Sequence, residues 1–337
     1  MIAWYVHHVG RGHAARAAAV ARHLRHDVVG LGSGPAPRPW PGAWEPLERD
    51  DLGAAPADVT ARGTLHWVPR HDRGLADRSA RIVERLTTLR PALVVVDVSV
   101  EVALLARLCG IPVVVVALPG DRDDRVHGLA YEAAEALLAP WPPGTHDVSW
   151  PDRLRERTWA VGAFGRLDGM PVRPTSRGPV GRVLLLWGGG GRSTTDADVA
   201  AARAATPGWE WTECSGDDPA DVVHDRLAAA DVVVTHGGQN AVAEVAAARR
   251  PAVVVAQERP FDEQRATARV VDRMGIAVGL EAWPDAAEWP DVLRRAEARG
   301  GEGWAAWSSG TGALEAATRL DALAEERSPV RVPEAAR

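Results

Sequence analysis

Lysine is absent from this 337-residue sequence, in which all 39 basic residues are arginine. Its absence excludes a Schiff-base lysine and the lysine of a phosphate-binding P-loop. Cysteine is also scarce: Cys109 and Cys214 lie far apart in sequence and belong to no metal-ligand pattern. We therefore expect two buried, reduced thiols, as in a cytoplasmic protein.

Long apolar runs are missing as well. The longest, residues 111–118, is far too short to span a bilayer. The N-terminus shows no basic segment followed by an apolar stretch and a cleavage site. A net charge of −6 argues against bulk binding of nucleic acid. These absences predict a cytoplasmic protein that makes at most peripheral contact with the inner face of the membrane.

Phenylalanine and tyrosine contribute two residues each, whereas tryptophan contributes fourteen. Packing is the more frequent role of tryptophan, although some of these rings could line a ligand pocket. The chain is long enough for two domains with full cores. We expect a first domain at residues 1–170, a linker at 171–181, a second domain at 182–327 and a disordered tail at 328–337.

The stretch 231–264 carries the clearest pattern. It begins with a short apolar strand at 232–234, continues through a glycine turn into an alanine-rich helix at 239–248, and enters a second apolar strand at 252–256. This order is one βαβ unit. The glycines allow the backbone to approach a ligand closely, and the helix N-terminus offers free N–H groups to a phosphate.

Side chains in this unit extend the predicted phosphate site. His236 can donate a hydrogen bond to a phosphate oxygen, and Glu244 can accept one from a sugar or ribose hydroxyl. The polar loop at 258–264 ends the second strand on the same side of the sheet. A phosphate flanked by hydroxyl acceptors suits a nucleotide sugar. The alternative is a glycine turn of an ordinary doubly wound sheet that binds nothing.

The N-terminus repeats the same arrangement of a strand at 1–8, a glycine turn and a helix at 14–26. His13 lies at the start of that helix, where the helix dipole favours the neutral imidazole that a general base requires. Asp97 ends the strand at 91–98 and is expected to face the same crevice, where it could orient His13. The alternatives are a solvent-facing or capping His13 and a helix N-cap at Asp97 or Ser99.

The remaining elements follow from apolar periodicity and from proline and glycine breaks. We expect strands at 28–31, 113–118, 183–187 and 210–214; helices within 62–90 and at 100–109, 131–138, 196–205, 221–229, 311–326 and from 266; and loops at 32–57 and 141–150.

Four motifs stand at strand ends of this pattern: Gly10-Arg11-Gly12-His13, Gly188-Gly189-Gly190-Gly191-Arg192-Ser193, His236-Gly237-Gly238-Gln239-Asn240 followed by Glu244, and Glu263-Gln264. The last two are similar to signatures of plant and antibiotic-tailoring glycosyltransferases. The first two resemble the glycine-rich loops of the bacterial lipid-linked N-acetylglucosaminyltransferase of peptidoglycan synthesis. The chain thus resembles the GT-B superfamily of nucleotide-sugar-dependent glycosyltransferases from Gly10 to about Gly279.

The resemblance implies an α/β GT-B fold, with two Rossmann-like doubly wound domains that face a central cleft and a C-terminal helix. It implies inverting transfer of a sugar from a UDP- or dTDP-sugar to an acceptor hydroxyl or other nucleophile, without a cofactor or bound metal. His13 would be the base, steadied by Asp97. The residues implied to bind the nucleotide sugar are Gly12, Gly189, Gly190, Arg192, Ser193, His236, Gly237, Gly238, Gln239, Asn240, Glu244, Asp262, Glu263 and Gln264.

Within that set, His236 and the N–H groups of residues 238–240 would hold the diphosphate. Glu244 would bind the ribose, residues 262–264 the sugar, and the nucleobase would lie near the loop before residues 221–224. Ala241 replaces the serine or threonine of the signature, which removes one phosphate contact and leaves the nucleotide open.

The acceptor is not identified by the sequence. Arg122, Arg125 and His127, in the charged loop 119–127, could meet it. A secondary metabolite, a lipid-linked or cell-envelope intermediate and a peptide all remain open. Two further functions also remain open. His13 followed by Arg16 resembles the Gly-His-x-x-Arg pattern of nucleotide-sugar hydrolases, and some members of the superfamily are non-catalytic helpers of an active transferase.

Overall fold

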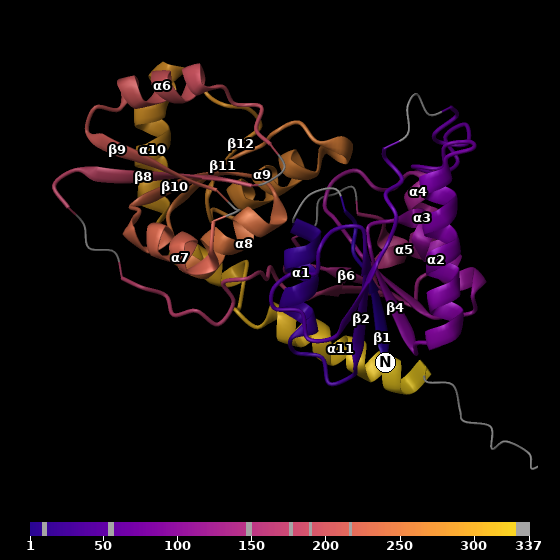
Figure 1. The fold of residues 1–337 in the computed structure, drawn as a ribbon. Coiled ribbons are helices and arrows are strands. Elements are labelled where there is room, and N and C mark those ends of the chain that lie inside the picture. The colour runs from indigo at the N-terminus through magenta and orange to yellow at the C-terminus, as the bar shows by residue number, and fades with distance from the viewer. Residues whose placement is uncertain are drawn as a thin grey trace, which may run out of the picture.

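The computed structural model describes residues 1–8, 12–52, 57–145, 150–174, 178–188, 191–215 and 218–327. The chain forms two lobes, each built on one sheet (Figure 1). All ten strand pairings within these two sheets are parallel. The predicted doubly wound α/β architecture is therefore confirmed.

The first domain contains a seven-stranded sheet in the order β3-β2-β1-β4-β5-β6-β7, so the strand order reverses direction between β1 and β4. Central strands are buried on both faces, which explains their unbroken valine and leucine runs. The strands are β1 (Ile2–Tyr5), β2 (Val28–Gly32), β3 (Ala43–Pro46), β4 (Leu93–Asp97), β5 (Val113–Val116), β6 (Ala136–Ala139) and β7 (Thr158–Ala160).

Helices cover both faces of the first sheet. One face packs against α2 (Arg73–Leu89), α3 (Val100–Leu108) and α4 (Arg125–Ala133), which stand together at the outer side of the lobe (Figure 1). The other face packs against α1 (Gly12–Ala21). A short helix, α5 (Asp152–Arg155), precedes the last strand.

The second domain contains a five-stranded sheet in the order β12-β11-β10-β8-β9, the flavodoxin-like order, which reverses between β8 and β10. Helices α6 and α10 cover one face, and α7, α8 and α9 cover the other. The strands are β8 (Gly181–Trp187), β9 (Trp209–Ser215), β10 (Val232–His236), β11 (Ala252–Val255) and β12 (Val278–Leu280). The helices are α6 (Asp196–Ala205), α7 (Ala220–Ala229), α8 (Gln239–Ala248), α9 (Glu263–Arg273) and α10 (Trp289–Arg299), with short 3₁₀ turns η1 (Pro260–Asp262), η2 (Ala286–Glu288) and η3 (Glu302–Ala306).

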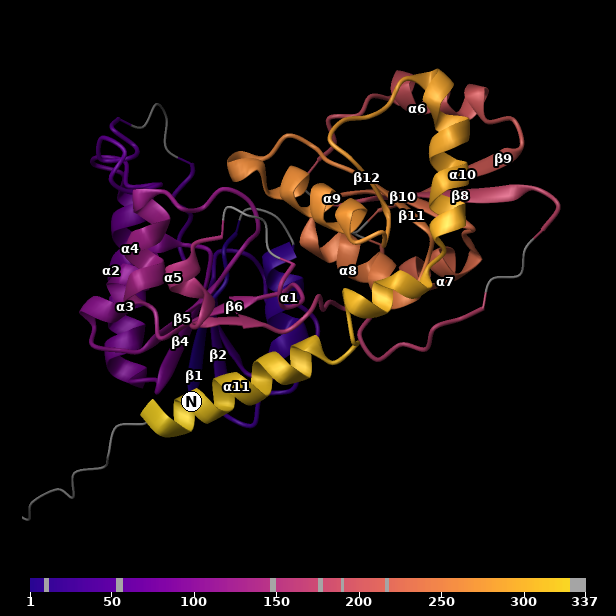
Figure 2. The same cartoon turned by 180° about the vertical axis from the view of Figure 1, so that it is seen from behind.

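The last helix, α11 (Gly312–Arg327), returns to the first domain and crosses it beside α1 (Figure 2). Its alanines and Leu320 join the core formed by Ile2, Trp4 and Leu93. Asp321 is 1% exposed and accepts hydrogen bonds from the backbone N–H groups of Arg25 and His26. The first domain is therefore assembled from two separate parts of the chain.

Three expectations about secondary structure are wrong. Residues 125–127, expected in the loop 119–127, form the start of α4. The helix expected at 131–138 does not form: α4 ends at Ala133 and β6 occupies Ala136–Ala139. A short apolar run has no periodicity that distinguishes a helix from a strand. Here residues 136–139 pair with β5 on one side and with β7 on the other, so they form a strand. The loop expected at 32–57 contains the edge strand β3, which pairs with β2. The tail at 328–337 lies outside the described residues.

Within the described ranges, no helix is both long and apolar enough to cross a membrane.

Candidate active site

The two sheets carry their sites at equivalent places. In each sheet the strand order reverses at one point, and ligands of open α/β sheets bind in the crevice at the carboxyl ends of those strands. His13 and Asp97 lie at the reversal in the first sheet, and His236 and Gly188 at the reversal in the second. The two places adjoin, because the Asn240 side chain donates to the backbone oxygen of Gly12 across 3.1 Å.

His13 and Asp97 are brought together as the sequence predicts. The distance between Nδ1 of His13 and Oδ1 of Asp97 is 3.1 Å, and the Asp97 residue is fully buried. Burial raises the pKa of Asp97, but the charges of Arg16 and His13 outweigh it and lower that pKa to about 2. Asp97 is therefore a carboxylate at neutral pH.

The backbone conformation after Asp97 directs the Asp97 side chain towards His13. Val98 has a φ of 59°, in the left-handed region that a β-branched residue rarely adopts. The sharp turn lets Ser99 cap α3, where its hydroxyl accepts from the Val102 N–H across 3.3 Å. Ser99, and not Asp97, is therefore the N-cap, and Asp97 remains directed at His13.

Arg16 is the residue of this group that sequence reasoning noted only in passing. The Arg16 residue is 3% exposed, and its guanidinium donates from Nη2 to Asp97 Oδ1 across 2.7 Å. The same Nη2 lies 3.0 Å from Nδ1 of His13. Its Nη1 donates to Oε1 of Gln239 in the second domain. The (i, i+3) spacing of His13 and Arg16 on one helix face was the available signal.

His236 ends β10 as a neutral hydrogen-bond donor. Burial, followed by the charge of Arg259, lowers its pKa to about 4. Nδ1 accepts the N–H of Gly238 across 3.0 Å, which assigns the ring proton to Nε2. The Gln264 side chain opposes this pKa shift, but no described residue forms a hydrogen bond of normal geometry with the buried Nε2.

The space around His236 depends on two glycines. A Cβ at Gly188 would lie 2.5 Å from Nε2, and a Cβ at Gly238 would lie 2.4 Å from Cε1 of the ring. Any larger residue at either position would collide with the imidazole. The ring therefore lies between two bare backbone segments, one of them at the N-terminus of α8, which is the arrangement expected of an anion site.

Carboxamides are confined to this region. The only asparagine and the three glutamines of the sequence are Asn240, Gln239, Gln257 and Gln264. Nε2 of Gln239 and Nε2 of Gln257 are buried without a hydrogen-bond partner in the described part of the chain. Gln264 Oε1 accepts the N–H of Gln257 across 3.0 Å. Gln257 was missed from the sequence, although this clustering of amides could have found it.

Glu244 is buried on α8 and uses only one of its carboxylate oxygens. Oε1 accepts from Nε of Arg166 across 2.7 Å, while Oε2 has no partner among the described residues. Burial raises the pKa of Glu244, although Arg166 opposes the shift. Arg166, which also donates to the backbone oxygen of Asp218, is a second residue that the sequence did not indicate.

The loop before α9 docks on the first domain. The N–H of Asp121 donates to the backbone oxygen of Phe261 across 2.8 Å. Phe261 and Asp262 have φ values of 60° and 53°, so the loop turns sharply towards this contact. Glu263 pairs with Arg122 across 3.2 Å, whereas the Asp262 side chain pairs with Arg265 across 2.9 Å. Two of the predicted sugar-binding carboxylates are thus engaged in ion pairs.

The three predicted acceptor residues do not form one surface. Arg122 is 6% exposed, lies over the Phe261 ring and places Nη1 2.8 Å from Nε2 of His127. His127 is buried and bonds through Nδ1 to Asp124. Arg125 is exposed at the start of α4. An acceptor role for these residues stays a prediction.

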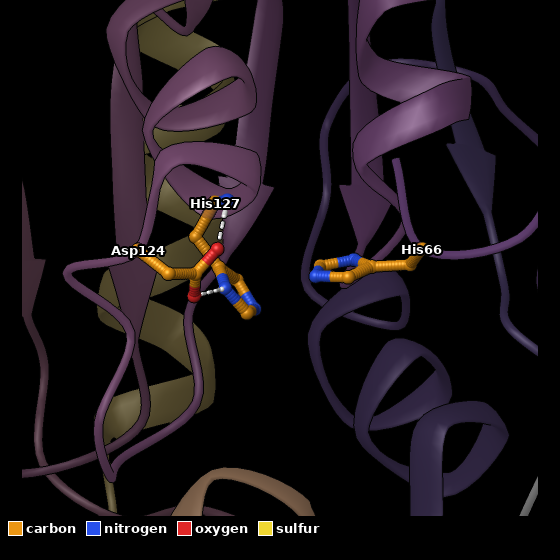
Figure 3. A group of neighbouring side chains, drawn as sticks. All are labelled: His66, Asp124 and His127. Atoms are coloured by element: carbon orange, nitrogen blue, oxygen red, sulfur yellow. Dashed lines mark hydrogen bonds and ion pairs between the residues drawn. The ribbon is translucent and has the colours of Figure 1, made fainter. Parts of the chain in front are cut away.

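In the part of the chain that the structure describes, two groups of side chains offer metal-ligating atoms. In one, His66 faces His127 and Asp124 (Figure 3). Both ring nitrogens of His127 are already engaged, one by Asp124 and the other by Arg122, whereas Nε2 of His66 has no partner among the described residues. The fixed cation of Arg122 would repel a metal ion at this place.

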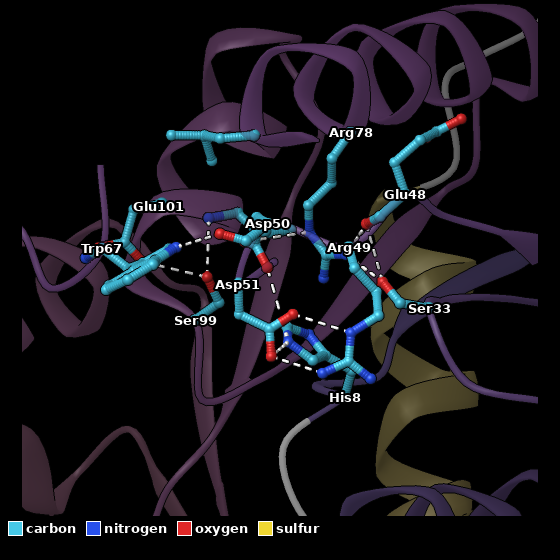
Figure 4. A network of polar contacts seen from close by, with 12 residues as sticks. His8, Ser33, Glu48, Arg49, Asp50, Asp51, Trp67, Arg78, Ser99 and Glu101 are labelled. Atoms are coloured by element: carbon cyan, nitrogen blue, oxygen red, sulfur yellow. Dashed lines mark hydrogen bonds and ion pairs between the residues drawn. The ribbon is translucent and has the colours of Figure 1, made fainter. Parts of the chain in front are cut away.

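The second group consists of His8, Asp50 and Asp51 (Figure 4). Nε2 of His8 lies 3.6 Å from Asp50 and 3.5 Å from Asp51. Arg49 forms a two-point contact with Asp51, and Nε of Arg78 lies 3.7 Å from Asp50. The two guanidinium charges already balance the two carboxylates, so we assign no metal to either group.

The remaining predicted residues belong to the two glycine-rich segments that follow β1 and β8 in the sequence. Gly12 is the first residue of α1 and faces Asn240. Arg192 pairs with Asp196 and lies over the Trp187 ring, and Ser193 is exposed. Gly189 and Gly190 lie outside the described residues.

A largely apolar pocket lies between the domains, next to Gln239. Three buried tryptophans contribute to its wall, so packing and pocket lining coincide for these rings. It is lined by Pro119, Gly120, Pro140, Trp141, Thr145, Trp150, Gln239, Val242, Ala266, Thr267, Val270 and Trp307.

Comparisons with known proteins concern one segment of the second domain and the overall fold. Residues 220–283 match the family described as "Glycosyltransferase family 28 C-terminal domain", a segment that contains His236, Glu244 and Glu263. None of the curated proteins compared with the chain matches it.

Solved structures resemble the chain over nearly its whole length. They include CalG4, the calicheamicin glycosyltransferase, at 19% identity and a TM-score of 0.66, with 97% of this chain and 99% of that chain covered. The glycosyltransferase VinC in complex with dTDP is 17% identical, with a TM-score of 0.60 and 96% and 99% covered. The spinosyn rhamnosyltransferase SpnG complexed with spinosyn aglycone is 17% identical, with a TM-score of 0.58 and 97% of each chain covered. The chain therefore has the fold of these enzymes, and the expected resemblance is confirmed.

Proposed function

We propose that this chain, whose two domains have the GT-B fold, is a glycosyltransferase that moves a sugar from a nucleoside-diphosphate sugar to a nucleophile of the acceptor. The family match and the structural neighbours support an enzyme of this class. The residues at the two sheet reversals support different roles for the two domains. The first domain supplies the base, and the second binds the donor.

The observation that carries the proposal is the set of unused polar atoms around the N-terminus of α8. His236, Gln239 and Gln257 each leave a buried N–H donor without a partner in the described part of the chain, and Glu244 leaves one carboxylate oxygen. An unsatisfied buried polar group costs about 1–3 kcal/mol. A diphosphate can accept from N–H donors, and a ribose hydroxyl can donate to a carboxylate, so a nucleoside diphosphate would satisfy both kinds of group.

The chemistry that fits these groups is inverting displacement. Neutral His13, oriented by Asp97, would remove the proton of the acceptor hydroxyl as its oxygen attacks the anomeric carbon. The bond from that carbon to the diphosphate breaks in the same step. The α8 N-terminus and His236 would stabilise the charge on the leaving diphosphate, so the reaction needs no bound metal.

The donor that we favour is a dTDP- or UDP-sugar. VinC is described in complex with dTDP, which makes a thymidine nucleotide the first to test here. Arg192, Ser193 and Gly12 would complete the phosphate site, and Asp262, Glu263 and Gln264 the sugar site. The ion pairs of Asp262 and Glu263 would have to open, or share their carboxylates, for the sugar to bind.

For the acceptor we favour a small organic molecule. SpnG is described with an aglycone bound, and the interdomain pocket of the present chain offers tryptophan rings beside Gln239. Flat or apolar acceptors would pack on these rings.

Hydrolysis of the same donor is a second candidate, because Arg16 is buried against His13 as part of a Gly-His-x-x-Arg sequence. Water would then take the place of the acceptor. Release of free sugar from a dTDP-sugar without acceptor, at the rate seen with acceptor, would favour the hydrolase.

The first experiment is thermal unfolding in the presence of a panel of nucleoside diphosphates. A ligand at a hundred times its Kd adds about 2.7 kcal/mol to the stability of the folded state, which is easily seen as a shift in Tm. We expect dTDP or UDP to stabilise the wild type, and His236→Ala and Glu244→Ala to lose most of that shift. The exposed His71 supplies the control variant His71→Ala, which should keep it. If no nucleotide shifts the wild-type Tm, the donor site is refuted.

A further inference from the structure

Three side-chain atoms form a tight triangle at the base. Nη2 of Arg16 lies 2.7 Å from Oδ1 of Asp97 and 3.0 Å from Nδ1 of His13, and the last two atoms are 3.1 Å apart. Arg16 and Asp97 are almost completely buried, so solvent does not relieve a mismatch between donors and acceptors here.

Hydrogen counting in this triangle determines the tautomer of His13. A guanidinium Nη carries two hydrogens and accepts none, so Arg16 can donate to Asp97 and to His13 at the same time. Nδ1 of His13 must then be an acceptor, and the ring proton lies on Nε2. In this arrangement Nε2 has no lone pair available, so His13 cannot act as a base through that nitrogen.

The base-competent arrangement needs the opposite tautomer. With the proton on Nδ1, His13 would donate to Asp97, which is already close enough at 3.1 Å. An N–H of Arg16 would then face an N–H of His13, so the guanidinium has to withdraw from Nδ1. Oδ2 of Asp97 has no partner among the described residues and is available to receive the displaced guanidinium.

The second domain offers the means of withdrawal. The other terminal nitrogen of Arg16, Nη1, donates to Oε1 of Gln239, the first residue of α8. A diphosphate bound at that helix terminus would give Arg16 an anionic partner, and guanidinium–phosphate hydrogen bonds are stronger than those to a neutral amide.

We infer that Arg16 is a positioning residue that couples occupancy of the donor site to the tautomer of His13. Without donor, Arg16 holds His13 with its proton on Nε2. When the diphosphate draws the guanidinium towards α8, Nδ1 takes the proton and bonds to Asp97, and the Nε2 lone pair faces the acceptor. Donor binding thereby precedes activation of the acceptor. This inference depends on the proposed function, because the coupling ligand is the donor diphosphate.

Two-bond ¹H–¹⁵N spectra of histidine-labelled protein distinguish the two tautomers, and His13→Gln assigns the His13 signals. In the pH range where the ¹⁵N shifts of His13 show a neutral ring, we expect the Nε2–H form in ligand-free wild type and the Nδ1–H form with dTDP bound. Arg16→Lys keeps a cation beside Asp97 but cannot reach all three partners, so it should show the Nδ1–H form in both states. Arg22→Gln, an exposed change next to the same helix, should behave like the wild type.

Calorimetry on the same samples separates this inference from the proposed function. If dTDP binds the wild type but the His13 tautomer does not change, the coupling is refuted and the donor site stands. An unchanged Nε2–H form in a folded Arg16→Lys protein would also refute it, since Arg16 would then not be the cause. If neither dTDP nor UDP binds, the proposed function and this inference both fail.

Discussion

Arg166 and Glu244 form a hydrogen-bonded ion pair in which Nε of Arg166 lies 2.7 Å from Oε1 of Glu244. Arg166 lies on the connection that leaves the first domain, and Glu244 lies on α8 in the second domain. Their side chains are 24% and 6% exposed. The carboxylate that we assign to the donor ribose therefore also fastens the connection between the domains.

The first prediction concerns the stability that this pair contributes. Glu244→Gln and Arg166→Met should each lower the free energy of unfolding by about 1–3 kcal/mol, because each leaves a partly buried charge without its partner. The double variant should lose less than the sum, with a coupling of about 1–2 kcal/mol. Urea unfolding of the four proteins measures this cycle. Strictly additive losses would mean that the two side chains do not stabilise each other.

The second prediction separates binding from chemistry at His13. His13→Gln should reduce the turnover rate of a dTDP-sugar, measured as release of dTDP, by about 10²–10⁴-fold, because it removes the general base. Affinity for dTDP should change much less than turnover, since the ring lies on the acceptor side and touches the donor site only through Arg16. Steady-state turnover and calorimetry test the two halves. A variant that turns over normally would remove His13 from the mechanism.

The third prediction concerns the pH dependence of stability at Asp97. Its pKa falls from the ordinary 3.8 to about 2 in the folded protein, so the folded state binds fewer protons than the unfolded state between those values. The resulting stabilisation, about 2 kcal/mol, is present above about pH 4 and is lost as the pH falls towards 2.

Asp97→Asn lacks this titration. The gap in unfolding free energy between wild type and variant should therefore narrow as the pH falls through that window, as far as both proteins remain folded. Urea unfolding at a series of pH values measures the gap, and a gap that stays constant would contradict the assignment of an ionised, paired Asp97.

The fourth prediction tests the docking of the second domain at Gly120. A Cβ there would lie 2.1 Å from the backbone oxygen of Phe261, whereas a Cβ at Gly110 would meet nothing within 4 Å. Both glycines have a positive φ, so alanine strains the backbone at each, by about 1 kcal/mol. Only Gly120→Ala also pushes the domains apart.

We therefore expect Gly120→Ala to lose more stability than Gly110→Ala and to increase the radius of gyration in small-angle scattering. Equal losses and an unchanged radius in the two variants would show that the contact with Phe261 does not hold the domains together.

Local patterns in the sequence were sufficient to predict most helices and strands near the candidate active site. The helix α8 begins after Gly238 and ends before Pro251, and its observed bounds, Gln239–Ala248, are the predicted ones. The turn that presents His236 was predictable for the same reason, because glycine and proline mark backbone breaks wherever they occur.

Contacts between the domains were not predictable in this way. The hydrogen bond from Arg16 to Gln239 joins residues 223 positions apart, and no local periodicity encodes it. The same holds for Arg166 and Glu244, and for the engagement of Glu263 by Arg122. The prediction of a helix at 131–138 failed for a related reason. Pairing with the neighbouring strands, and not the alanines and leucines of the segment itself, makes residues 136–139 a strand.

The return of α11 to the first domain has a consequence for the order in which the chain matures. Ile2, Trp4 and Leu93 are covered by a helix that ends at Arg327 and follows the whole second domain in the sequence. Domains usually fold in the order in which they leave the ribosome. Here the second domain holds all five of its strands before α11 emerges, so it can close its core first. The first domain, although made first, keeps the part of one apolar face that α1 does not cover exposed until α11 has followed the second domain out of the ribosome.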